Sequence, residues 1–172
     1  MIIIHSTQKL LNTSHLKPVL YISQPTEKQL LHSWYARLLS TGISGKFLVM
    51  YVHQPSLMTI LCKGKTIQGT WMEFTQRLTA LLQRSGFPKS YIEWETQHMN
   101  GYVVSKTASK SMLAHMNQMV ATLKYHIYLT GAFENMSQDF LEDLMMDHLH
   151  SSAKNEYTTP SEFWRKTIEA LN

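Results

Sequence analysis

The chain has 172 residues, 44% of them hydrophobic, a formal net charge of +4 and one cysteine, Cys62. This composition excludes a disordered chain and an intrachain disulfide, and it predicts a single domain, 1–172, with a core of its own. No apolar run reaches the roughly 18 residues of a membrane helix and residues 1–11 lack a secretory signal pattern, so we expect a cytoplasmic protein that does not bind a membrane.

The first part of the chain predicts a strand and a helical turn. Residues 2–5 are mostly β-branched, which is typical of a buried strand. Residues 7–11 predict a helical turn that ends before Pro18. Residues 19–22 are expected to be extended, as a short segment at the sheet edge.

A helix is predicted next, because Thr26 and Gln29 fit a capping box and Gly42 is a natural stop. The apolar residues between them recur at helical spacing. These residues are Leu30, Leu31, Trp34, Tyr35 and Leu38.

The middle of the chain predicts a hairpin followed by a helix. Residues 46–53 and 56–62 are apolar at most positions and flank Pro55, which belongs in the turn because it cannot donate a ladder hydrogen bond. Residues 70–73, TWME, form a second capping-box pattern, and the helix that they begin is expected to end at Gly86.

The remaining elements alternate less regularly. They are a short helix over 88–94, a strand over 102–105, a long helix over 108–129, a helix capped by Ser137, a loop over 151–159 that could be flexible, and a last helix begun by 159–162. We therefore predict an α+β fold. Its small, mainly antiparallel sheet contains strands near 2–5, 46–53, 56–62 and 102–105. About five helices pack on it, with 108–129 as the long central helix.

The stretch GYVVSKTASKSMLAHMN, residues 101–117, carries the most suggestive local chemistry. A Walker-type phosphate loop needs G-x-x-x-x-G-K-[ST], and here the second glycine is absent. The start of a long helix nevertheless attracts anions through its unpaired amide hydrogens. Candidate anion-binding residues are Lys106, Thr107, Ser109, Lys110 and Ser111.

A structural role for the same stretch is the alternative, in which Thr107 or Ser109 caps the helix. Asn117 and His115 form a possible polar site further along this helix. Asn117 is expected at the border of the core, where its amide needs a hydrogen-bond partner from a neighbouring element.

No catalytic residue, metal site or cofactor is predicted. Asp147, His148 and His150 are close in sequence, but on a helix His148 and His150 do not face each other, and Asp147 with His150 alone has the three-residue spacing of metal ligands. Cys62 and His53 lie on the same predicted hairpin and could approach each other. A buried strand cysteine is more often a core residue, however.

Charge is distributed unevenly along the chain. Residues 1–110 contain twelve Lys and Arg against four acidic residues, a net charge of +8, whereas 111–172 contain four against eight, a net charge of −4. A basic body can attract nucleic acid. The case is weak because the basic residues are scattered in sequence and the acidic helices could fold back over them.

Four stretches together resemble an uncharacterised prokaryotic family known as a domain of unknown function. They are TQKLL near the start, WYARLL at 34–39, FLVMYVHQPSLMTIL and KTASKSMLAHMN. The resemblance covers residues 1–130 in the same order and implies no activity, substrate or cofactor. It marks 106–117 as a shared feature.

This sequence departs from the family pattern at several positions. Ser6 is found where the family has cysteine, and Lys106 and Lys110 are found where it has arginine or a similar residue. Ala114, His115 and Gln118 replace the glycine, serine and aspartate of the family pattern. Lysine is a point charge that cannot grip an anion bidentately as arginine does.

These observations predict a non-catalytic intracellular binding or interaction module, of a kind that often travels with mobile elements. Its partner could be another protein or a second copy of the chain. One alternative is a small phosphate- or nucleotide-handling enzyme that uses residues 106–117, and another is a nucleic-acid-binding protein that uses the basic segment 1–110.

Overall fold

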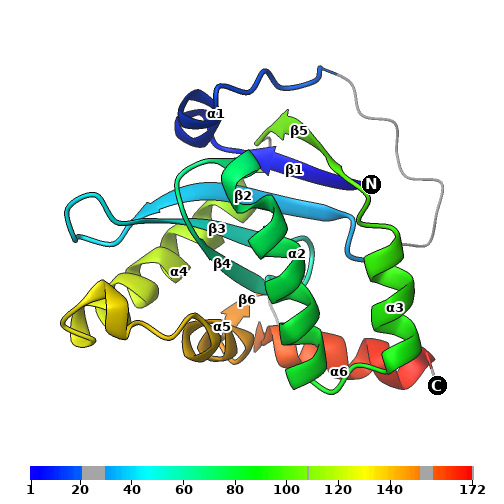
Figure 1. Ribbon diagram of the computed structural model, residues 1–172. Coiled ribbons are helices and arrows are strands. Elements are labelled where there is room, and N and C mark those ends of the chain that lie inside the picture. Colours follow the sequence, from blue (N-terminus) through cyan, green and yellow to red (C-terminus); the bar gives the residue numbers. More distant parts are fainter. Residues whose placement is uncertain (21–29, 108, 152–156, 172) are drawn as a thin grey trace.

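The computed structural model describes residues 1–20, 30–107, 109–151 and 157–171, which form a sheet covered by helices (Figure 1). The five strands of this sheet run in the order β4-β3-β2-β1-β5. They are β1 (Ile2–Ser6), β2 (Ser33–Ser40), β3 (Phe47–His53), β4 (Thr59–Lys63) and β5 (Tyr102–Lys106). The predicted α+β class and the four predicted strands are confirmed, although β4 begins three residues later than expected.

The sheet is mixed, because β1 pairs in parallel with both β2 and β5 while β2, β3 and β4 form an antiparallel meander. The prediction of a mainly antiparallel sheet is therefore wrong in half of its pairings. The two parallel partners of β1 come from distant parts of the chain. A tight turn joins only antiparallel strands, so no turn motif in the sequence predicts a parallel pairing.

Strand β2 occupies the place of a predicted helix, so that prediction is wrong for residues 33–40. Trp34 and Ala36 face one side of the sheet, Tyr35 and Leu39 face the other, and all four are buried. A strand that is covered on both faces is apolar at successive positions, which imitates the apolar stripe of a helix. Thr26 and Gln29, the expected capping box, lie outside the described residues.

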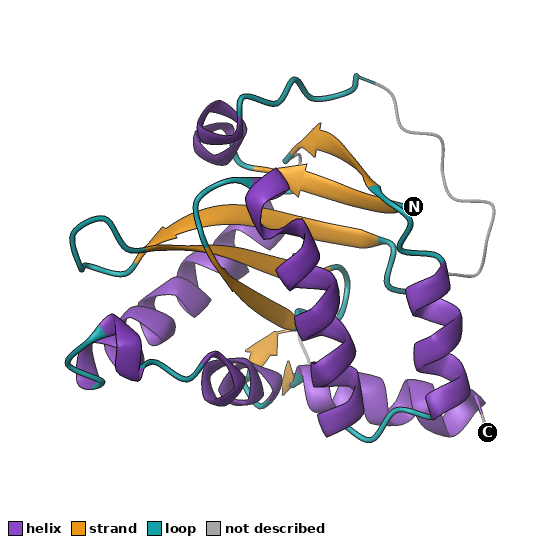
Figure 2. Cartoon of the chain, in the orientation of Figure 1, coloured by secondary structure: helices purple, strands orange, loops and turns teal. Residues whose placement is uncertain are grey.

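Helices cover both faces of the sheet, with α2 in front and α4 behind in the view of Figure 2. The six α-helices of the described residues are α1 (Gln8–Ser14), α2 (Ile67–Arg84), α3 (Lys89–Gln97), α4 (Lys110–Leu129), α5 (Gln138–Met146) and α6 (Pro160–Leu171). A short 3-10 helix, η1 (Phe133–Asn135), joins α4 to α5. The long helix α4 begins two residues after the predicted start, and Ala108 lies outside the described residues.

Two hydrophobic cores result, one on each face. The α2-side core includes Ile4, Leu11, Trp34, Phe74, Leu78 and Trp164, and the α4-side core includes Tyr35, Met50, Met116, Leu123, Leu141 and Met145. The neighbouring residues Met145 and Met146 are both buried, and each belongs to a different core. Both can be buried because α5 ends where the two cores meet.

Three helix starts test the capping predictions. Thr159 and Glu162 exchange hydrogen bonds of 3.1 and 3.2 Å, so the capping box of α6 is confirmed. The Ser137 hydroxyl accepts the Phe140 amide hydrogen at the start of α5, as predicted. Helix α2 begins earlier than expected, because Thr66 is its N-cap residue. Thr70 lies inside the helix instead and is bonded to Tyr51 Oη at 2.7 Å.

The predicted loop over 151–159 contains regular structure at both ends. β6 (His150–Ser151) and β7 (Tyr157–Thr158) pair as a small antiparallel sheet. Residues 152–156 between them lie outside the described part of the chain. Ser151, Tyr157 and Thr158 within the predicted loop are therefore extended and paired, and the flexibility of the segment stays a prediction.

Side chains from two helices cover the free edge of β4. The Leu61 amide donates to Glu142 Oε1 at 3.0 Å, and Gln138 Nε2 donates to the Leu61 carbonyl at 2.6 Å. The Lys63 amide donates to Glu73 Oε2 at 3.0 Å. These bonds occupy backbone groups that an edge strand otherwise leaves unpaired.

Candidate functional site

The junction between β5 and α4 carries the predicted anion-binding residues. Ser109 is the N-cap residue of α4, and its hydroxyl accepts the Met112 amide hydrogen at 3.2 Å. The Thr107 amide donates to the Ser6 carbonyl at 3.3 Å, which ties the junction to the end of β1. The prediction that Thr107 or Ser109 caps the helix is confirmed, with Ser109 in that role.

The five candidate residues lie together at the start of α4, but they differ in exposure. Lys106, Lys110 and Ser111 are exposed, whereas Thr107 and Ser109 are half-buried. Neither lysine forms an ion pair with another described residue. The arrangement is compatible with an anion at the positive end of the helix, and anion binding there stays a prediction.

A row of polar side chains crosses the sheet beside this junction. His5 lies opposite Tyr35 on one neighbouring strand and Ser105 on the other. Its Nδ1 is 3.1 Å from Ser105 Oγ, and its ring lies 4.8 Å from the Tyr35 ring. Burial lowers the pKa of His5, and a hydrogen bond with the backbone of Lys106 acts in the opposite direction. The imidazole is therefore mostly neutral at neutral pH.

Tyr35 connects this row to the helix start. Burial raises the pKa of its phenol, while hydrogen bonds with the hydroxyl and backbone of Ser109 act in the opposite direction. The Ser105 hydroxyl donates to the Lys106 carbonyl at 3.0 Å, so its proton is not directed at His5. The serine and the histidine therefore join β1 to β5, and they lack the arrangement of a nucleophile with its general base.

Asn117 has the partner that its position on α4 predicted. Arg37 Nη1, on β2, donates to Asn117 Oδ1 at 2.6 Å. Arg37 is half-buried, and burial lowers the pKa of its guanidinium. Asn117 itself is exposed rather than at the core border, because Arg37 reaches outward to meet it.

His115 faces a different element, so the predicted polar pair is not brought together. Its ring lies 5.8 Å from that of His150, on β6. Burial lowers the pKa of His148 and of His150, and the nearby His115 acts in the same direction on both. His115 and Asn117, two residues apart on a helix, point to nearly opposite sides.

Lysines gather at one edge of the sheet, where four strands end. β1, β2 and β5 are mutually parallel, β4 runs in the same direction as β2, and the arrowheads of β1, β2 and β5 point to the same side in Figure 1. We call the six lysines at these strand ends the basic edge. They are Lys9 after β1, Lys46 between β2 and β3, Lys63 and Lys65 at the end of β4, and Lys106 and Lys110 at the end of β5.

Four basic residues outside the basic edge are paired on the helices. Arg77 and Arg84 of α2 bind three acidic residues of α5, namely Asp139, Glu142 and Asp143. Lys89 pairs with Glu93 on α3, and Arg165 pairs with Glu169 on α6. At the basic edge, only Lys46 has an ion-pair partner among the described residues, Glu134 at 3.4 Å.

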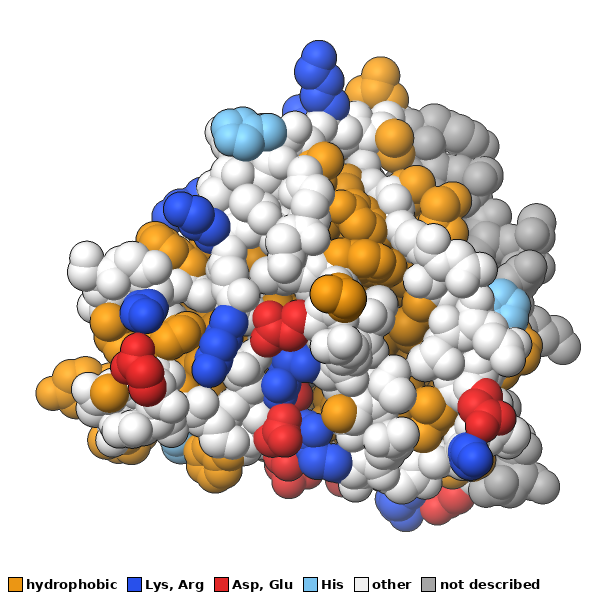
Figure 3. Space-filling view, in the orientation of Figure 1, with side chains coloured by type: hydrophobic (Ala, Val, Ile, Leu, Met, Phe, Trp, Pro, Cys, Tyr) orange, Lys and Arg blue, Asp and Glu red, His pale blue; other side chains and the backbone are white. Residues whose placement is uncertain are grey.

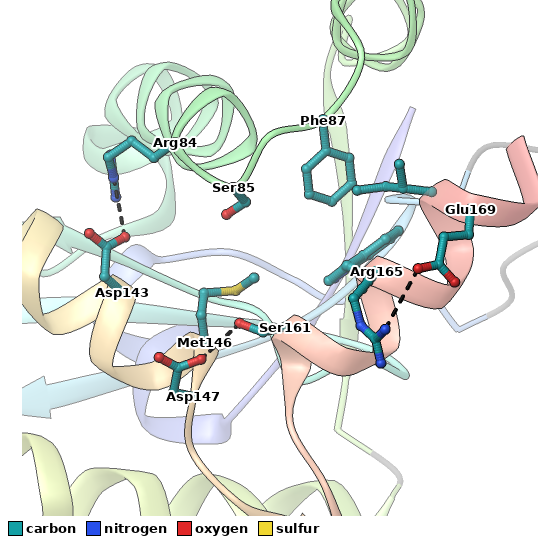
Figure 4. A pocket seen from close by; sticks show the side chains of 11 residues that line it. Arg84, Ser85, Phe87, Asp143, Met146, Asp147, Ser161, Arg165 and Glu169 are labelled. Atoms are coloured by element: carbon teal, nitrogen blue, oxygen red, sulfur yellow. Dashed lines mark hydrogen bonds and ion pairs between the residues drawn. The ribbon is translucent and has the colours of Figure 1, made fainter. Parts of the chain in front are cut away.

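A pocket of about 440 Å³ lies between the end of α2, α5 and α6 (Figure 4). Arg84 points to Asp143, Ser161 to Asp147 and Arg165 to Glu169, and each pair is bonded. Phe87 and Met146 provide apolar surface. The two arginines that line this pocket are therefore already paired with carboxylates, while the Asp147 carboxylate is hydrogen-bonded to the neutral Ser161 hydroxyl.

Several chemistries lack their residues in the described part of the chain. No three His, Cys, Asp or Glu side chains are grouped so that they could hold a metal ion, and no helix there is both long and apolar enough to cross a bilayer. Cys62 lies opposite Val49 in the ladder, four residues from His53, so the two are not brought together. Burial also raises the pKa of the Cys62 thiol, which keeps it unreactive.

A sequence profile of the family described as "Domain of unknown function (DUF6933)" matches residues 3–163. The chain belongs to this family. No curated protein and no solved structure matches it. The resemblance to an uncharacterised family that the sequence motifs indicated is confirmed, and it extends past residue 130 to the start of α6.

In this DUF6933 chain, sequence reasoning missed His5, Tyr35 and Arg37. Tyr35 and Arg37 were assigned to a helix, which concealed their alternation with Trp34 and Ala36 on a strand. The one signal that could have found them is the short run Ser33, Tyr35 and Arg37 at alternate positions, and the apolar pair Leu38 and Leu39 breaks this alternation. His5 ended a predicted strand, but its partners depend on parallel pairings that join residues up to 100 apart.

Proposed function

We propose that this DUF6933 chain is a non-catalytic binding module whose ligand is a nucleic acid, held at the basic edge. The observation that carries the proposal is the gathering of six lysines from four strand ends. Lysines that are scattered in sequence become one electrostatic surface when the strands align. Such a surface attracts phosphates regardless of base sequence.

The dimensions of the edge suit a nucleic-acid backbone. Five strands at a spacing of roughly 4.8 Å span about 19 Å, which is about the length of five or six phosphates along one strand of DNA. Three acidic residues of α5 pair with arginines of α2, and Glu93 of α3 and Glu169 of α6 each pair with a basic residue of their own helix. Five of the six lysines at the edge have no ion-pair partner among the described residues.

The non-catalytic part of the proposal rests on the chemistry around the edge. His5 and Ser105 share a hydrogen bond, but the serine proton is directed to a carbonyl. Cys62, the single cysteine, is buried with a raised pKa. We therefore expect binding without turnover when nucleic acid is incubated with the protein.

Fluorescence anisotropy with labelled single-stranded and duplex oligonucleotides tests binding directly. If about five phosphates are contacted, the logarithm of affinity should fall against the logarithm of salt with a slope of about −3.5 for single strands and about −4.5 for duplex. A flat salt response, or no binding in low salt, would reject the proposal.

Charge-removing variants locate the surface. Lys9→Gln and Lys106→Gln should each weaken binding and make the salt slope less steep by about one phosphate contact. Lys89→Gln, on α3 away from the basic edge, is the matched control and should leave both quantities unchanged. Equal effects from all three variants would show that the binding has no fixed site.

A second candidate is a phosphate-handling enzyme that uses residues 106–117. It is favoured by one observation: the adjacent parallel strands β1 and β5 lead into α1 and α4, which pack on opposite faces of the sheet. Ligand crevices in α/β sheets form at such places. Release of phosphate from nucleotides, abolished by Lys110→Gln, would support this candidate over simple binding.

A further inference from the structure

A pocket of about 220 Å³ lies within the basic edge, where the turn between β2 and β3, the end of β4 and η1 meet. Three lysines line it: Lys46, Lys63 and Lys65. In Figure 3, basic side chains surround apolar ones at the left of the molecule, the side toward which this turn and η1 extend in Figure 1. The pocket is smaller than the sites that hold drug-sized ligands, which start at about 300 Å³.

An aromatic ring holds two of the three charges in place. Lys46 Nζ lies 5.5 Å and Lys63 Nζ 5.2 Å from the centre of the Phe133 ring. The electron-rich face of such a ring attracts ammonium groups. Phe133 is buried, with 8% of its surface exposed, so the ring is a fixed point against which both side chains are ordered.

The pocket has excess positive charge. Glu134 is the carboxylate paired with these lysines in the described part of the chain, and it lies 3.4 Å from Lys46 Nζ with a side chain that is 71% exposed. Glu73 binds the backbone amide of Lys63 and does not line the pocket. Three ammonium groups and one carboxylate leave a net charge of +2.

This charge matches one class of ligand. A phosphate monoester carries a charge of about −1.5 to −2 at pH 7, because its second pKa is about 6. A phosphate diester inside a nucleic-acid chain carries one negative charge. Gly45, at φ 71, adds no side chain to the lining, and a Cβ built on it meets no atom within 4 Å. The pocket therefore has room for a compact anionic group.

We propose that Lys46 and Lys63, held over the Phe133 ring, form a binding site for a phosphate monoester together with Lys65, and that the monoester is the terminal phosphate of a nucleic acid. The second half of this statement rests on the proposed function, whereas the first rests on the pocket alone. A free nucleotide carries the same chemical group, so the experiment must separate the two sources.

The test compares oligonucleotides of one sequence, labelled at the 3′ end, with either a phosphate or a hydroxyl at the 5′ end. Anisotropy in low salt should show the phosphorylated strand binding about fivefold tighter, as expected for an added charge near several ammonium groups. Lys63→Gln and Lys65→Gln should each bring this ratio close to one. Lys106→Gln, at the same edge but outside the pocket, should weaken both strands equally and keep the ratio.

The outcomes distinguish a failure of the monoester-binding site from a failure of the proposed nucleic-acid binding. If the 5′-phosphorylated and the 5′-hydroxyl oligonucleotide bind equally well, the proposed monoester-binding site is wrong, while the proposal of nucleic-acid binding is supported. A second outcome is that a nucleoside 5′-monophosphate binds to the wild-type protein but not to Lys63→Gln, while neither oligonucleotide binds. In that case the monoester-binding site is supported with a free nucleotide as its ligand, and the proposed nucleic-acid binding is wrong. If inorganic phosphate, the mononucleotide and both strands all fail to bind, both are overturned. Circular dichroism confirms that the variants fold.

Discussion

Glu142 joins α5 to the edge of the sheet, and its removal should destabilise the protein more than any other single ionic change. Its side chain is fully buried. It accepts the Leu61 amide hydrogen at 3.0 Å, Arg77 Nε at 2.7 Å and Arg84 Nη2 at 3.2 Å. Burial lowers the pKa of the Arg77 guanidinium, but the hydrogen bonds and charges of Glu142 and Asp139 outweigh it and raise this pKa, so Arg77 remains charged at any accessible pH.

The expected cost of Glu142→Ala can be worked out from these contacts. Removing one partner of a buried ion pair costs about 3–5 kcal/mol, because the remaining charge is left uncompensated. Here the side chains of Arg77 and Arg84 are 17% and 28% exposed and keep bonds to Asp139 and Asp143, so water and these acids offset part of the loss. We therefore expect the lower end of that range, about 3 kcal/mol.

Urea unfolding followed by circular dichroism measures this cost. With an m-value of about 2 kcal/mol per molar urea, the midpoint should fall by about 1.5 M, and the melting temperature should fall by about 6–12 °C. Asp143→Ala is the control, since this carboxylate is 52% exposed and binds the same arginine, Arg84. It should cost less than about 1 kcal/mol. Equal costs for the two variants would refute the reasoning, because burial would then contribute nothing.

Three further predictions concern the core and the start of α4. Burial lowers the pKa of His53 from 6.5 to about 3, so between these values the unfolded chain binds a proton that the folded chain excludes. Stability should therefore fall by about 1.4 kcal/mol per pH unit on acidification, and urea midpoints at several pH values should show this part of the slope lost in His53→Asn. Ser109→Ala should cost about 1 kcal/mol through the lost cap, whereas the exposed Ser111→Ala should stay within about 0.5 kcal/mol. A double-mutant cycle of Arg37→Met and Asn117→Ala should give a coupling of about 1 kcal/mol, and additivity would show that their 2.6 Å contact is not formed in solution.

Local patterns predicted local structure well. The cap at Ser109, the capping box at Thr159 and the strand at Tyr102–Lys106 each depend on residues within a few positions. The failure at Ser33–Ser40 has a physical cause. When both faces of a strand are buried, the alternation of apolar and polar residues disappears, and only the pairing partners decide between helix and strand.

The candidate site was predictable only in part. The residues around Lys106 were singled out because they share one short stretch. The convergence of Lys9, Lys46 and Lys63 follows from strand directions, and these were not available from sequence periodicity. Contacts such as that of Arg37 with Asn117, which are 80 residues apart, carry no local signal at all.

The covered edges of the sheet determine how this protein can meet a partner. Side chains of α2 and α5 occupy the outer backbone groups at Leu61 and Lys63 of β4, and the Val19 amide donates to the Val104 carbonyl of β5 at 2.8 Å. A peptide therefore cannot extend the sheet by β-augmentation at these positions without displacing bonds already formed. The same coverage protects the native protein against edge-to-edge pairing of β4 with a strand of another molecule, and detachment of α5 would remove that protection at Leu61 along with the contribution of α5 to stability.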